Sequence, residues 1–145
     1  MDVIDCVFCS VIAGEAPAVV VRRWPDAIAI RPTRPVAPGH LLVIPLVHVA
    51  DAGQDPAVAA RTMLRAAELA GELPAANLIT SKGSAATQTV FHLHLHVVPR
   101  TEGDALPLPW TPHPLTPTPS LDPAGPPDLT GSADPAAYQD GDGAR

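Results

Sequence analysis

The 145 residues carry a formal net charge of -6, and this length predicts one ordinary domain with room for a short appendage. The negative charge argues against nucleic acid as a partner, because the phosphate backbone attracts basic proteins. No apolar run approaches the ~20 residues that cross a bilayer. The opening MDVIDCVFCS lacks the basic start and long apolar stretch of a secretory signal. We therefore expect a cytoplasmic protein that binds neither nucleic acid nor membranes.

The first half of the chain predicts one short helix and three strands. The helix covers about residues 7–13 and ends at a glycine. Three apolar runs bounded by proline-containing turns follow, and they predict strands at 19–24, 27–31 and 40–45.

The second half predicts one long helix and two more strands. The helix covers residues 55–73, with Asp55 as its N-cap and a proline in its first turn. The strands are expected at 77–81 and 91–98. Five strands and one main helix predict an α+β fold with an antiparallel sheet. Alanine, methionine and leucine cover much of the long helix, so a second face of it is available for a homodimer contact.

The composition changes sharply near residue 100, where proline, threonine, aspartate and glycine become dominant. Such a segment has too few large apolar side chains to offset the entropy lost on ordering. We therefore predict a folded domain over residues 1–110 and a proline-rich disordered tail over 111–145.

The run FHLHLHVV, residues 91–98, alternates histidine with aliphatic residues. Successive side chains of a strand point to opposite faces, so His92, His94 and His96 are expected on one face, about 6.5–7 Å apart. An incidental polar edge would more typically carry threonine, lysine or glutamate. The alternation therefore favours a chemical role for the three imidazoles.

Two chemical roles fit a row of histidines on a strand. One is chelation of zinc or iron by a His-x-His pair, and the other is nucleophilic attack by an imidazole on phosphorus. The preceding loop, GSAATQTV, is small and hydroxyl-rich, so its backbone amides with Gln88 and Thr89 can approach an anionic phosphate. A metal hydrolase would also need carboxylates nearby, and the nearest in sequence are Glu102 and Asp104. This comparison favours phosphate chemistry.

The chain's two cysteines, Cys6 and Cys9, form a Cys-x-x-Cys motif. The pair is too close in sequence to link distant parts of a fold. Metal binding and redox cycling are the specific hypotheses, and two small buried residues are the alternative.

Three segments together resemble the histidine triad (HIT) family of nucleotide hydrolases and transferases. They are QTVFHLHLHVV, PGHLLVIPLVH and the N-terminal CVFC. The family signature, His-φ-His-φ-His-φ-φ with φ apolar, is matched at every position of residues 92–98. The resemblance covers residues 1 to about 110.

The resemblance implies a two-step transfer at the α-phosphate of a nucleotide, of the phosphoramidase or dinucleoside polyphosphate hydrolase type. It assigns the nucleophile to His94, which would form a covalent nucleotidyl-histidine. It assigns phosphate contact and assistance to the leaving group to His96, and a place in the proton network to His40. Gln88 and Thr89 match the family's phosphate-binding pair.

The resemblance also implies a structural zinc. In zinc-bearing members a cysteine pair joins two histidines, and the matching residues here are Cys6, Cys9, His48 and His92. Two thiolates and two imidazoles make a closed tetrahedral site.

Three positions depart from the family pattern. Pro32 stands where an aspartate usually grips the ribose. Ser81, which we expect among the residues that bind the nucleotide or its phosphate, replaces an asparagine that helps hold the active-site loop. Thr87 replaces a glycine. Arg31 and Arg34 flank the first departure, and they either meet a second anionic group or are ordinary solvated charges.

Two alternatives to the HIT-type enzyme stay open from the sequence. One is a metal-dependent hydrolase in which the three triad histidines are ligands. The other is a non-catalytic nucleotide-binding module, for which the missing aspartate and the proline-rich tail argue.

Overall fold

The computed structural model describes residues 5–109, and the predicted tail at 111–145 lies outside the described residues. The chain divides into two units after Leu106, and every described helix and strand lies before that residue. Among the described residues, no helix combines the length and apolar character needed to cross a membrane.

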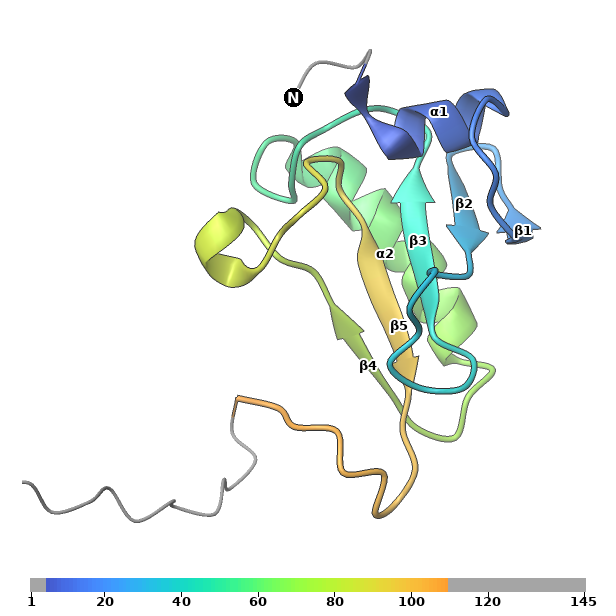
Figure 1. Ribbon diagram of the computed structural model, residues 1–145, viewed down its shortest axis with the longest axis vertical. Helices are drawn as coiled ribbons and strands as arrows, with labels where there is room; N and C mark the ends of the chain where they lie inside the picture. The colour runs from blue at the N-terminus through green and yellow to red at the C-terminus, as the bar shows by residue number, and fades with distance from the viewer. Residues whose placement is uncertain (1–4, 110–145) are drawn as a thin grey trace, which may run out of the picture. The chain divides into compact units, whose positions relative to one another are not determined.

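A five-stranded antiparallel sheet with two α-helices forms the fold, which confirms the predicted α+β class (Figure 1). Its strand order is β1-β2-β3-β5-β4. The strands are β1 (Val20–Arg23), β2 (Ala27–Ile30), β3 (Leu41–Pro45), β4 (Ala76–Ile79) and β5 (Leu95–Pro99). The helices are α1 (Val7–Ala13) and α2 (Pro56–Ala70), and a short 3-10 helix, η2 (Ser84–Ala86), lies between β4 and β5.

The long helix α2 begins where the sequence predicts and ends earlier. The Asp55 carboxylate accepts hydrogen bonds from the amides of Ala57 and Val58 at 2.9 and 3.0 Å, which caps the helix. The helix ends at Ala70 rather than at residue 73. Gly71 has a low helix propensity, and a proline three residues later disfavours helical backbone before it.

The sheet buries side chains on both faces because a helix packs on each. α2 covers one face (Figure 1), where its apolar residues contact a buried row made of Ala27, Ala29, Val43, Leu95 and Val97. α1 packs on the other face against Ile28, Ile30, Leu42 and Ile44. His96 alternates with Leu95 and Val97 and therefore lies on the α1 face.

The prediction of a strand over residues 91–98 is wrong for its first half, since β5 begins only at Leu95. β3 pairs with β5 as far as Val43↔Leu95. Before that point the chain leaves the sheet, and the Leu93 amide instead donates to the Val49 carbonyl at 2.7 Å. The two leucines remain buried. Of the triad, only His96 belongs to the strand.

The homodimer stays a prediction. The α2 side chains Met63 and Leu64 are 42% and 53% exposed, so the helix has apolar surface outside the core of this chain.

Candidate functional site

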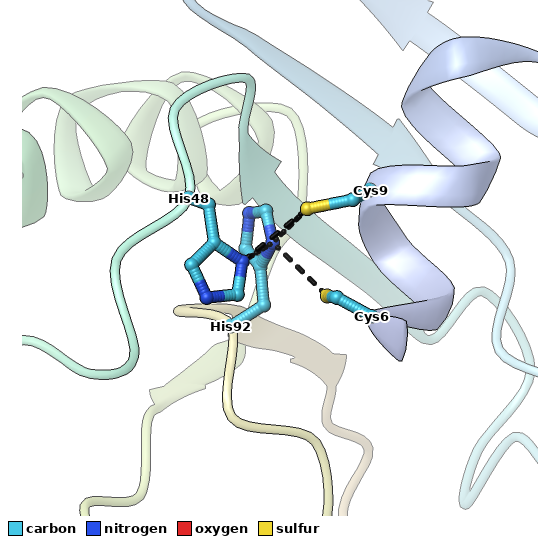
Figure 2. A group of neighbouring side chains, drawn as sticks. All are labelled: Cys6, Cys9, His48 and His92. Atoms are coloured by element: carbon cyan, nitrogen blue, oxygen red, sulfur yellow. Dashed lines mark hydrogen bonds between the residues drawn. The ribbon is translucent and has the colours of Figure 1, made fainter. Parts of the chain in front are cut away.

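Two cysteines and two histidines converge beside the N-terminal end of α1 (Figure 2). Cys6 is the N-cap residue of α1 and Cys9 follows on its first turn, while His48 comes from the loop after β3. His92 precedes β5 and is completely buried. The four potential ligand atoms all lie within 4.8 Å of one another.

The geometry of this cluster fits zinc. A tetrahedral ion with Zn–S of about 2.3 Å and Zn–N of about 2.0 Å keeps its ligand atoms roughly 3.3–3.8 Å apart. The Sγ atoms of Cys6 and Cys9 both lie 3.5 Å from Nδ1 of His92, and Cys9 Sγ lies 3.3 Å from Nδ1 of His48. The two Nδ1 atoms are 3.2 Å apart. Two sulfurs and two nitrogens at these separations form a donor set suited to a closed zinc site.

The protonation of His92 also suits a metal ligand. Its Nε2 lies 2.9 Å from the Pro45 carbonyl, which can only accept a hydrogen bond. We therefore assign the proton to Nε2, which leaves the Nδ1 lone pair directed at the cysteines. Without a metal, burial is the main cause that raises the pKa of the Cys9 thiol to about 11, and the neighbouring Cys6 thiol adds to it. A bound cation would reverse this effect because a coordinating thiol is deprotonated.

His94 presents an unprotonated ring nitrogen. Its Nδ1 lies 2.8 Å from the backbone carbonyl of His92, so Nδ1 carries the proton and Nε2 keeps its lone pair. Phe8 packs edge-on against the imidazole, with ring centroids 5.2 Å apart. Burial holds the pKa of His94 below its usual value, so the ring is neutral at pH 7. A neutral imidazole with a free Nε2 is a competent nucleophile.

A second pair of histidines forms a directed chain of hydrogen bonds. The Val36 amide donates to Nδ1 of His40 at 3.2 Å, so His40 carries its own proton on Nε2. That Nε2 lies 2.9 Å from Nδ1 of His96, which accepts. His96 therefore carries its proton on Nε2 and can donate it to a ligand. Its ring centroid lies 5.1 Å from that of His94.

Both members of this pair are neutral at pH 7. Burial lowers the pKa of His40. Burial is also the first cause that lowers the pKa of His96 to about 4, followed by charge repulsion from His94 and His40. The site therefore combines one nitrogen lone pair with one N–H donor, and neither ring carries a charge.

His94 and His96 line a cavity of about 820 Å³ on the α1 face of the sheet. Thr89, Arg31 and Arg34 also line it, and no carboxylate does so among the described residues. Its apolar wall includes Val7, Phe8, Val11, Ile30, Leu42 and Val90. His92 lies with the cysteines and does not line this cavity, so the three triad rings do not converge on one point. A ligand that carries an anionic group next to a flat apolar group fits such a lining.

Of the other three residues predicted to bind the nucleotide or its phosphate, only one lines the cavity. Thr89 is exposed in the cavity. Gln88 is buried, and its side chain accepts from the Gly83 amide at 2.8 Å and donates to the Ala50 carbonyl at 2.7 Å. Its amide thus holds the loop in place, and direct phosphate contact by Gln88 stays a prediction. Ser81 is half-buried and does not line the cavity.

Thr87 adopts a left-handed backbone conformation with a φ of 66°. A left-handed backbone is unfavourable for a β-branched residue, which explains why the family that this chain resembles commonly has a glycine at this position. We expect Thr87→Gly to raise the free energy of unfolding by up to about 1 kcal/mol. Glycine adopts the left-handed backbone without steric cost, but it also gains conformational entropy in the unfolded chain, which offsets part of the stabilisation. Thr87→Ala keeps the Cβ atom and is the matched control. Urea unfolding of both variants checks this, and an alanine variant as stable as the glycine variant would contradict it.

Some site residues escape sequence analysis. Phe8 lies between the two cysteines in the sequence, but residues one or two positions apart on a helix point in different directions, so this spacing does not indicate its contact with His94. Nothing in the sequence indicates that the Val36 amide fixes the tautomer of His40, because this depends on how the proline-rich loop folds.

The fold and site define an α+β protein in which a row of histidines lies beside a Cys₂His₂ cluster. A family model described as the HIT domain matches residues 13–103. The chain belongs to the HIT family. The two cysteines lie before the matched residues.

Similar proteins include characterised and uncharacterised members. An uncharacterised HIT-like protein of Mycobacterium tuberculosis, Rv1262c, is 42% identical over 108 residues, which are 70% of this chain and 75% of that protein. The adenylylsulfatase HINT3 of Arabidopsis thaliana is 33% identical over 109 residues, 70% of this chain but 55% of HINT3. The crystal structure of a zinc-bound histidine triad protein of Mycobacterium smegmatis is 38% identical, with a TM-score of 0.65, covering 73% of this chain and 82% of that one.

Proposed function

We propose that this protein is a nucleotidyl hydrolase or transferase that attacks the α-phosphate of a nucleotide derivative with Nε2 of His94. The observation that carries the proposal is the hydrogen bond from Nδ1 of His94 to the His92 carbonyl. That bond fixes the tautomer in which the lone pair belongs to Nε2, on a ring that lines the cavity. The rotation of the ring is restricted as well, which favours in-line attack.

The reaction would proceed in two balanced steps. In the first, the Nε2 lone pair of His94 forms a bond to phosphorus, and the bond from phosphorus to the leaving group breaks. In the second, a water oxygen bonds to phosphorus, the N–P bond breaks, and the electron pair returns to Nε2. The water proton passes to solvent. Another acceptor in place of water would make the reaction a transfer.

His96 would stabilise the charge that develops on the phosphoryl oxygens. Its Nε2–H is the donor available to a ligand, and His40 holds the ring in that tautomer through Nδ1. Thr89 adds a hydroxyl group in the same cavity. Sulfate or phosphate departs as an anion, whereas an amine takes a proton from solvent, which matches the proton that the water releases in the second step. Neutral donors that are already oriented need little reorganisation in the transition state.

Zinc held by Cys6, Cys9, His48 and His92 would supply no chemical step. It would link α1, the loop after β3 and the segment before β5 at one point. Because the His92 carbonyl also accepts from His94, such a link would fix the backbone group that orients the nucleophile.

The resemblance to the adenylylsulfatase HINT3 makes adenylyl sulfate one candidate substrate. We would test the holoprotein with adenosine and guanosine phosphoramidates, diadenosine polyphosphates and adenylyl sulfate, and follow release of the nucleoside monophosphate by chromatography. Turnover of at least one of them without added metal is the expected result. Turnover that is lost on chelation and returns with metal would favour the metal-dependent hydrolase. Nucleotide binding without any turnover would favour the binding module.

We expect the acidic limb of kcat/KM to have its midpoint below pH 6.5. His40 and His96 act as neutral rings, and burial lowers the pKa of both, that of His96 to about 4. Activity is therefore complete at pH 7 and is lost as the pH falls through these lowered values. The groups that face His96 are His40, His94 and, across the cavity, the two arginines. A pH–rate profile of zinc-replete protein, with zinc measured at each pH, checks this. A midpoint at or above pH 6.5 would contradict it.

A further inference from the structure

Arg31 and Arg34 line the same cavity as His94 and His96. They are the charged side chains of that lining, because its remaining described residues are apolar, hydroxyl-bearing or the two neutral histidines. The cavity is therefore locally cationic in a chain whose net charge is -6. A charge of this sign inside the ligand cavity favours a ligand that carries more negative charge than one phosphoryl group.

The sheet register sets the distance between the two polar ends of the cavity. Ile30 of β2 pairs with Leu42 of β3, which in turn pairs with His96 of β5. Two strand spacings therefore separate Ile30 from His96, about 10 Å between the backbones. Arg31 follows Ile30 directly, so the arginines lie at one end of the row and the catalytic histidines at the other. The apolar Ile30 and Leu42 lie between them.

Neither arginine is used by the fold. Three other described arginines are paired with carboxylates, in Arg22–Glu72, Arg65–Asp26 and Arg100–Asp104. Arg23 and Arg61 have no ion pair with a described carboxylate either, but they do not line this cavity. Arg31 and Arg34 are exposed and form no ion pair with any described carboxylate. Their guanidinium groups are thus free to bind a ligand, which an ion-paired arginine is not.

The side chains at the arginine end of the cavity indicate whether the bound sugar has free hydroxyl groups or carries a phosphate. A site that binds a sugar diol offers a carboxylate to accept hydrogen bonds from the hydroxyls, whereas a site that binds a sugar phosphate offers arginine. Here a carboxylate is absent from the described lining, and Pro32 between the arginines has no side-chain acceptor. We infer that Arg31 and Arg34 bind a second phosphate on the sugar, so that the preferred substrates are 2′- or 3′-phosphorylated nucleotides. This rests on the proposed function and names its substrate class.

The test compares four ligands with the zinc-loaded full-length protein by calorimetry. They are AMP, adenosine 3′,5′-bisphosphate, adenosine 2′,5′-bisphosphate and the non-hydrolysable α,β-methylene ADP, whose second phosphate lies on the leaving-group side. We expect one of the bisphosphates to bind about tenfold more tightly than AMP, since charge-assisted bonds from arginine to phosphate are strong. Arg31→Gln with Arg34→Gln should lower the affinity for the bisphosphate about tenfold more than the affinity for AMP, and so remove this difference. Arg23→Gln is the matched control, since Arg23 is an exposed arginine outside the cavity and without an ion pair.

Each outcome decides a different point. Loss of the preference in the double variant, but not in Arg23→Gln, supports the inference. If AMP and both bisphosphates bind equally, or if the arginines affect only α,β-methylene ADP, the inference is overturned while the proposed function stands. If no nucleotide binds, both are overturned.

Discussion

His94→Asn is expected to lower kcat by at least about a thousandfold while nucleotide binding changes little, because a nucleophile that forms a covalent intermediate is rarely replaceable. The asparagine amide can still donate to the His92 carbonyl, as Nδ1 of His94 does now. It has no nitrogen lone pair for attack on phosphorus. The substitution therefore separates the chemical role of the ring from its structural contacts. Steady-state kinetics and calorimetry with AMP measure the two effects.

His40→Asn is the matched control for that experiment. His40 is buried and contacts His96 rather than the ligand, so its loss should reduce kcat by about ten- to a hundredfold, within the range of a supporting group. Zinc content and melting temperature must match the wild type in both variants. Activity of His94→Asn within tenfold of the wild type would contradict the assignment of the nucleophile.

Cys6→Ala is expected to abolish zinc binding and to lower the melting temperature by about 15 °C or more. A ligand present at a thousand times its Kd stabilises a fold by about 4 kcal/mol. For a domain of about 100 residues, each kcal/mol corresponds to about 4–8 °C. Cys6 is completely buried at the N-cap of α1, so no other group can replace its thiolate. Zinc analysis and calorimetric melting check both parts.

Ser10→Ala provides the control for Cys6→Ala, because Ser10 lies on the same helix and is not among the candidate ligands. We expect it to retain zinc and to melt within about 2 °C of the wild type, because replacing the half-buried Ser10 removes only one small hydroxyl group and leaves no charge unpaired. Activity should also fall in Cys6→Ala, since the metal site and the nucleophile share His92. A Cys6→Ala protein with full zinc content, or one that melts like the wild type, would show that the cluster holds no structural metal.

Local patterns in the sequence predict most of the elements correctly. The short helix over residues 7–13, the apolar runs that form strands and the Asp55 cap all depend on neighbouring residues, so they can be derived without the tertiary structure. The strand over 91–98 fails in its first half for the opposite reason. Its end depends on where β3 stops pairing and on the bond from Leu93 to the distant Val49 carbonyl.

The functional site likewise combines features that the sequence predicts with features that depend on the tertiary structure. Of the residues that the resemblance names, His94, His96 and Thr89 line the cavity, and Cys9, His48 and His92 cluster with Cys6. The protonation of these histidines depends on long-range contacts. His40 and His96 are 56 positions apart, and only the fold brings Nε2 of one within 2.9 Å of Nδ1 of the other. The position of Arg31 and Arg34 in the same cavity as His94 likewise follows from the pairing of β2, β3 and β5. The sequence leaves both arginines open between ligand binding and ordinary solvation.

The proposed mechanism requires a covalent bond between His94 and the nucleotide. Rapid acid-free quenching of the protein with a substrate found in the screen, followed by proteolysis and mass spectrometry, tests that bond. We expect a nucleoside monophosphate adduct on His94 that forms within one turnover, decays as product appears and is absent from His94→Asn. Turnover without any adduct on His94, or with an adduct on another residue, would contradict this mechanism.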